Sequence, residues 1–120
     1  MAYVDGFLLV VPKNKVEAYR RIARAAGKVW IGHGALEYRE CVGEDLNTMP
    51  GTASFPKRVK LAPREAVVFS WIVYKSRKDR DRVNAKAMKD PRLANMMDPK
   101  AMPFDSKRMV FGGFTMVVDL

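Results

Sequence analysis

Residues 66–75, with the sequence AVVFSWIVYK, decide the fold class of this chain. Valine, isoleucine and aromatic residues fill the stretch, and this composition is typical of a β-strand. Successive side chains of a strand point to opposite faces. One face therefore carries Val67, Phe69, Trp71 and Val73, and the other carries Val68, Ser70, Ile72 and Tyr74. An antiparallel strand with one face in water would alternate apolar and polar residues. This one does not, so we expect both of its faces to be covered.

Three further strands are predicted on either side of this stretch. Residues 3–11 are rich in β-formers and end at Pro12, residues 35–42 alternate in polarity, and residues 109–119 are apolar on both faces. In the second of these strands Leu36, Tyr38 and Val42 share the apolar face.

Two helices are predicted between the strands. The first covers residues 14–34, because its apolar residues recur at spacings of three and four: Val16, Tyr19, Ala23, Ala26 and Trp30. Asn14 is its predicted N-cap, and Gly32 or Gly34 is suited to end it in the left-handed conformation. The second covers residues 76–90, where Ser76 and Asp79 form an acidic variant of the capping box. Residues 43–65 are predicted to be a long irregular excursion, and the Met-rich residues 91–108 a covering loop.

The resulting order, strand–helix–strand–strand–helix–strand, predicts a single α+β domain over residues 1–120 with the ferredoxin-like βαββαβ fold. Such a fold has a four-stranded antiparallel sheet with both helices on one face. The other face is also apolar, and a second copy of the chain is the simplest cover for it. We therefore expect a homodimer through the sheet face, which is a dimeric α/β barrel.

Composition restricts the cellular setting and the cofactors. The chain has 120 residues, 48% of them hydrophobic, and no apolar run approaches the ~20 residues of a membrane helix. One cysteine makes no intrachain disulfide, which agrees with a cytoplasmic protein. The single histidine and the absence of clustered carboxylates predict no metal site. No phosphate-binding or dinucleotide-binding glycine motif is present, and no cofactor is expected.

Several strings resemble a known bacterial family. They are YVDGF at residues 3–7, HGALEYRECVG at 33–43, FSWIVYKSR at 69–77 and PFDSKRMVFGGF at 103–114. The match extends over nearly the whole chain, which is thereby similar to the YbaA-like family, bacterial domain of unknown function 1428. The resemblance implies a ferredoxin-like fold of the dimeric α/β-barrel type. It implies no function, although the wider superfamily includes cofactor-free monooxygenases and other small-molecule enzymes.

His33, the only histidine, is the candidate catalytic residue. An imidazole at a helix C-terminus has its charged form favoured by the helix dipole and is suited to act as an acid or base. The alternative is a Gly-His-Gly turn that ends the helix. Cys41 is too far along an extended strand to pair with His33 as a nucleophile.

Two candidate binding sites accompany it. A pocket between the helices and the sheet is expected to have Trp30, Tyr38 and Trp71 on its walls, Asn84 facing inward and His33 at its rim, with Met96, Met97 and Met102 over its mouth. An anion site is expected where the second helix begins, from its free N–H groups and Lys75, Arg77 and Lys78. Ordinary capping is the alternative interpretation of that segment.

The predicted function is binding of a small planar or anionic molecule, or a cofactor-free enzyme activity on it. A non-catalytic structural or stress-related module is the first alternative. The net charge of +9 also agrees with weak, nonspecific RNA binding. Specific RNA recognition is not expected, because residues 66–75 lack the glycine–aromatic signature of RNA-recognition strands and the free sheet face is expected to be buried.

Overall fold

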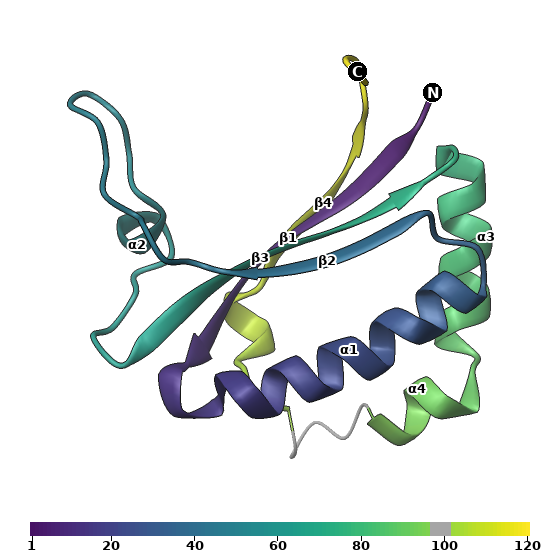
Figure 1. The fold of residues 1–120 in the computed structure, drawn as a ribbon, viewed down its shortest axis with the longest axis horizontal. Coiled ribbons are helices and arrows are strands. Elements are labelled where there is room, and N and C mark those ends of the chain that lie inside the picture. Colours follow the sequence, from purple (N-terminus) through teal and green to yellow (C-terminus); the bar gives the residue numbers. More distant parts are fainter. Residues whose placement is uncertain (97–101) are drawn as a thin grey trace.

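A computed structural model describes residues 1–96 and 102–120 of the chain. Along the chain the elements are β1 (Tyr3–Pro12), a 3-10 turn (Lys13–Lys15), α1 (Val16–Gly32), β2 (Glu37–Val42), α2 (Phe55–Arg58), β3 (Glu65–Tyr74), α3 (Arg77–Met88), α4 (Pro91–Met96), a second 3-10 turn (Ser106–Arg108) and β4 (Val110–Thr115). The strands form one antiparallel sheet in the order β2-β3-β1-β4. Helices α1, α3 and α4 lie on one side of it (Figure 1). This confirms the ferredoxin-like α+β fold.

The register of the sheet determines which residues face the helices. β1 pairs with β3 so that Phe7 lies opposite Ser70 and Leu9 opposite Val68. β2 pairs with the other edge of β3, with Glu40 opposite Ser70. Alternation then directs Phe7, Ser70 and Glu40 to the helix side, because paired residues project from the same face. The core lies between this face and α1, where Leu9, Val68, Tyr19 and Ala23 pack together.

The outer face of the sheet is only partly covered. α2 lies near one end of it, where the Phe55 and Phe69 rings meet edge to face at 6.4 Å and Val67 is buried. Even there Phe69 is 45% exposed, and on β4 Phe114 is 59% exposed. The two-sided apolarity of the central strand is therefore present in the fold, and in one copy much of the outer side faces solvent.

Four local expectations need correction. Asn14 lies in the 3-10 turn before α1 and does not cap that helix, because the turn places Lys15 at the N-cap position. The segment 91–108 is not a plain loop, since it contains α4 and a 3-10 turn. The excursion 43–65 contains α2, which is capped by the Ser54 side chain. β4 ends at Thr115, four residues before the predicted strand end, where β1, its partner, begins.

The predicted helix ends are correct in two places. The backbone N–H of Asp79 donates to Ser76 Oγ at 3.1 Å, so Ser76 caps α3 as expected. At the other end of α1, His33 is the C-cap residue and Gly34 follows with a φ of 118°. That backbone angle favours glycine, because other residues rarely adopt it.

Candidate functional site

A cavity of about 300 Å³ lies between α1 and the helix side of the sheet. Its surface is almost entirely apolar. α4 and the segment that precedes β4 close one side of it, through Leu93, Met96, Met102 and Phe104. A cavity of this size and character is within the range of small-molecule sites. The methionines predicted to cover the pocket include Met97, which lies outside the described residues.

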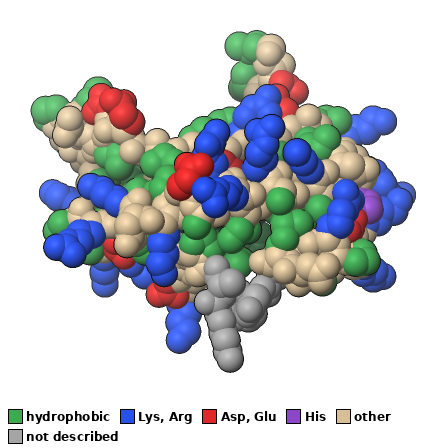
Figure 2. Space-filling view, turned by 60° about the horizontal axis from the view of Figure 1, so that its bottom comes forward, with side chains coloured by type: hydrophobic (Ala, Val, Ile, Leu, Met, Phe, Trp, Pro, Cys, Tyr) green, Lys and Arg blue, Asp and Glu red, His purple; other side chains and the backbone are tan. Residues whose placement is uncertain are grey.

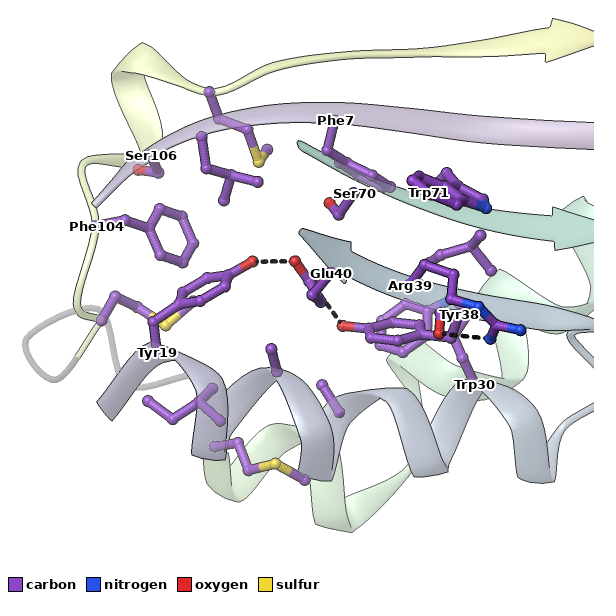
Figure 3. Close-up of a pocket in the computed structure, with 18 of the residues that line it drawn as sticks. Phe7, Tyr19, Trp30, Tyr38, Arg39, Glu40, Ser70, Trp71, Phe104 and Ser106 are labelled. Carbon is purple, nitrogen blue, oxygen red and sulfur yellow. Dashed lines mark hydrogen bonds between the residues drawn. The ribbon is translucent and has the colours of Figure 1, made fainter. Parts of the chain in front are cut away.

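Glu40 is the carboxylate in the cavity wall. It accepts a hydrogen bond from the Tyr19 hydroxyl at Oε2, over 2.7 Å, and one from the Tyr38 hydroxyl at Oε1, over 3.0 Å. Figure 3 shows the carboxylate between the two phenol rings, with Ser70 beyond it on the sheet. Tyr19 comes from α1, whereas Tyr38 and Glu40 are alternate residues of β2. The two tyrosines thus hold both oxygens in place from opposite sides.

The environment changes the acidity of all three groups. Burial raises the pKa of Glu40, although hydrogen bonds from Tyr19, Tyr38 and Ser70 lower it in part. Burial, followed by the charge of Glu40, raises the pKa of both Tyr19 and Tyr38 far above the usual range. The phenols therefore stay neutral donors. The carboxyl group keeps its proton to a higher pH than an exposed glutamate does, which suits it to exchange protons with a bound molecule.

Gly27 of α1 makes room for the Tyr38 ring. A Cβ atom built on Gly27 would lie 2.6 Å from Cδ1 of that ring, closer than carbon atoms approach. Tyr38 consequently packs directly on the helix backbone, and its hydroxyl reaches Glu40. The Tyr19 ring is held differently, by an edge-to-face contact with Phe104 at 5.8 Å.

The predicted pocket residues take different places. Trp30 and Tyr38 line the cavity. Trp71 also borders it, but its position in β3 directs the ring to the outer face, where it lies 5.5 Å from Phe69. Asn84 does not line the cavity. Its Oδ1 accepts hydrogen bonds from Trp30 Nε1 and the Tyr74 hydroxyl, both at 2.9 Å, so Asn84 orients the indole from behind.

His33 lies outside the cavity lining. Its Nε2 is 2.8 Å from Asp90 Oδ2, just before α4 begins. Hydrogen bonds from Arg92 and His33 hold the pKa of Asp90 well below its usual range. The contact joins the end of α1 to the connection between α3 and α4. The geometry agrees with the helix-ending interpretation, and the catalytic role stays a prediction.

The candidate anion residues Lys75, Arg77 and Lys78 are all exposed around the start of α3. One of the free N–H groups of that helix, on Asp79, is already bonded to Ser76 Oγ. Ordinary capping accounts for this contact. Anion binding at this helix end stays a prediction.

Two carboxylates were missed, of which Glu40 is half-buried and Asp5 is buried. Glu40 was assigned to no site, although alternation in residues 35–42 places it on the face of Tyr38 and Val42. Asp5 was hidden in a strand that looks apolar. It is 2% exposed and accepts a hydrogen bond from Arg80 Nη1 at 3.1 Å. Burial raises the pKa of Asp5, against the opposing charge of Arg80. An acidic residue inside an apolar strand was the available signal.

The βαββαβ topology and the helix-covered cavity define the class, a ferredoxin-like α+β protein. Two solved structures share this fold. One is the structure of Rv0793 from Mycobacterium tuberculosis, with a TM-score of 0.56, 13% identity and coverage of 99% of this chain and 98% of that one. The other is an uncharacterized NIPSNAP domain protein from Burkholderia xenovorans, with a TM-score of 0.56, 16% identity and coverage of 96% and 94%.

Sequence comparison identifies the family. The chain belongs to the family described as protein of unknown function DUF1428, whose model matches residues 2–106. It is 44% identical over 119 residues to the uncharacterized protein YbaA of Escherichia coli K12, and the alignment covers 99% of each protein. The YbaA protein of Shigella flexneri matches equally. The family resemblance seen in the sequence is therefore confirmed.

Among the helices of residues 1–96 and 102–120, none is both long enough and apolar enough to cross a bilayer. In those same ranges, no three His, Cys, Asp or Glu side chains gather as ligands of a metal ion would.

Proposed function

We propose that the protein binds a small, mainly apolar molecule in the cavity beneath α1 and holds it by a hydrogen bond to Glu40. The observation that carries this proposal is a carboxylate fixed by two tyrosine hydroxyls in the wall of a mainly apolar cavity. Even a half-buried carboxylate such as Glu40 costs stability unless its hydrogen bonds are well made. Its presence in this wall is more easily explained by a ligand than by the core alone.

The chemistry of the wall favours one class of ligand. A carboxylate accepts hydrogen bonds, so the fitting group on the ligand is a donor such as a phenol hydroxyl or an amine. An anionic group next to Glu40 would be repelled. The rings of Phe7, Trp30, Tyr38 and Phe104 border the space and suit a planar apolar body. Planar neutral ligands are thus preferred over anionic ones in this cavity.

Glu40 is also the group that carries an enzymatic version of the proposal. With a raised pKa it takes a proton from a bound donor and returns it, without a cofactor. Tyr19 and Tyr38 would stabilise the carboxylate form by donating to it. Without proton transfer by Glu40, the same pocket would bind the molecule and not convert it. The non-catalytic alternative differs from the enzymatic one only in that proton transfer.

The test is a thermal-shift screen of neutral phenols and aromatic amines, followed by calorimetry on the hits. Glu40→Gln keeps the size of the side chain and removes the charge, and we expect it to weaken binding about 10- to 100-fold. The matched control is Glu37→Gln, on the same strand but the opposite face and exposed. Hits that bind Glu40→Gln as tightly as the original protein would reject the proposal.

We also propose that two copies associate through the outer face of the sheet. The support is the exposed aromatic surface on that face, where Phe69 and Phe114 stand with Trp71 and Leu8 around a hollow of about 430 Å³. Exposed apolar patches of this kind mark interaction sites. Sedimentation equilibrium at micromolar concentration is expected to give twice 13.6 kDa. A monomer under these conditions would contradict the proposal, and it would reopen RNA binding on this face.

A further inference from the structure

A second hollow lies on the other side of Glu40, between α1 and β2. It has a volume of about 720 Å³ and is more polar than the cavity beneath the helix. Tyr19, Tyr38 and Glu40 line both spaces and so form the wall between them. β2 is an edge strand of the sheet (Figure 1). The groove, which β2 lines, lies along that edge.

The rim of the groove is basic. Arg20, Arg24 and Lys28 all line it and are spaced four residues apart, so they follow one another along one side of α1. Arg20 forms an exposed ion pair with Glu17 at 3.1 Å. Within residues 1–96 and 102–120, neither Arg24 nor Lys28 forms an ion pair. Lys and Arg side chains surround apolar surface on the side of the molecule that Figure 2 shows.

The floor of the groove is apolar. Val42 and Ile31 border it and are 49% and 47% exposed, and Val68 lies buried behind them. Glu40 is the acidic residue in its lining, and each of its oxygens accepts a hydrogen bond from a tyrosine hydroxyl. The groove therefore combines exposed hydrocarbon with a row of cations, and neither feature is needed by the fold.

We infer that the groove is a separate site for a small anionic amphiphile, with the hydrocarbon part on Val42 and the anionic head on Arg24 and Lys28. The basic rim is complementary to an anionic head, and the apolar floor is complementary to a hydrocarbon chain. A carboxylate-headed chain is the simplest molecule with both properties. A free molecule is favoured over a membrane surface, because the apolar side of α1 is already buried against the sheet and is not available to lipid.

The experiment uses octanoate and its uncharged counterpart 1-octanol, with binding followed by NMR in the intact protein. Octanoate is expected to shift the amide signals of residues that line only the groove, which are Ile31, Gly32 and Val42. The amide signals of Leu93 and Phe104, which line only the cavity beneath α1, are expected to stay unchanged. 1-Octanol is expected to bind at least about tenfold more weakly. Shifts confined to Leu93 and Phe104 would assign octanoate to the other site and overturn the inference, while leaving the proposed function open to its own test.

Charge reversal provides the matched comparison. Arg24→Glu is expected to weaken octanoate binding about tenfold or more, and added salt is expected to weaken binding to the unaltered protein. Arg21→Glu, on the same helix but outside the groove, is the control and is expected to change affinity less than about twofold. Equal losses in both variants would show a general charge effect. Tighter association with phosphatidylglycerol vesicles than with octanoate would show a membrane surface. Either result rejects the site.

Discussion

The two faces of the sheet depart in opposite ways from the usual pattern of apolar side chains inside and polar side chains outside. The helix-covered face buries polar groups, among them Asp5 and Ser70, and carries Glu40 in a cavity wall. The outer face exposes large aromatic side chains, of which Phe69 and Phe114 are examples. Buried polar groups and exposed apolar patches are the informative observations in a fold. Each face is therefore expected to have a partner, a small molecule on the inner one and a second chain on the outer one.

The largest effect is expected on the outer face. Phe69→Asp with Phe114→Asp places charges in the apolar patch and is expected to weaken self-association by about 1000-fold, since buried aromatic anchors contribute most to interfaces. Sedimentation across a concentration series measures this. Each single substitution should give an intermediate result. A double variant that associates as the original protein does would place the interface elsewhere.

The next largest effect is expected from Asp5 on the inner face. Asp5→Ala leaves Arg80 without its partner at a site where that side chain is 16% exposed, and we expect a loss of about 3 kcal/mol of unfolding free energy. Urea denaturation measures the change. The double variant Asp5→Leu with Arg80→Leu is expected to recover part of the loss, because it removes the unpaired charge. An unchanged midpoint for Asp5→Ala would show that Asp81, 2.9 Å from Arg80, compensates.

A smaller loss is expected from Gly27→Val in α1. The added methyl groups meet the Tyr38 ring and force it away from the helix, which is expected to cost about 2 kcal/mol. Ligand binding in the cavity should weaken too, since Tyr38 no longer reaches Glu40. The control for β-branching is Gly32→Val in the same helix. A Cβ added at Gly32 would have an Arg92 side-chain nitrogen at 4.0 Å as its neighbour. If the two substitutions reduce stability and ligand binding equally, Gly27 has no specific role in positioning Tyr38.

The pH dependence of Glu40 has a defined sign. Burial raises its pKa in the folded protein, so the folded state binds the proton more tightly than the unfolded chain does. Stability is therefore lost as pH rises from the unfolded value of about 4.3 through the folded pKa. Glu40→Gln removes this penalty, and its stability relative to the original protein is expected to grow over that range. Glu37→Gln should give a flat difference. If the stability difference between Glu40→Gln and the original protein does not change with pH, the hydrogen bonds of Glu40 lower its pKa as much as burial raises it.

The smallest effect is expected from His33→Ala at the end of α1. The contact with Asp90 is partly buried but lies outside the cavity, so ligand binding should be unchanged and the unfolding free energy should fall by about 1 kcal/mol. A ligand screen by thermal shift on both proteins checks this. Lost binding or turnover with an intact fold would restore His33 as a site residue.

On the helix-covered face of the sheet, the sequence predicted the aromatic residues of the cavity and missed the carboxylates. Trp30 and Tyr38, which were expected on the pocket walls, do line the cavity, since aromatic residues on the apolar side of a helix or strand turn inward. Their binding role stays a prediction. Glu40 and Asp5 were missed because a carboxylate is expected in solvent unless its partners are known. Those partners, Tyr19 and Arg80, stand 21 and 75 residues away along the chain.

By itself, the sequence determined the order of the elements, the antiparallel fold class and the apolar character of both sheet faces, because periodicity and turn residues act over short distances along the chain. Only the tertiary structure decided which polar residues meet. The register of β2 against β3 and the passage of α1 over both bring Tyr19, Tyr38 and Glu40 to one point. Hydrogen bonds require atoms within about 3 Å of each other, and a pattern of residue types does not specify distances across a fold.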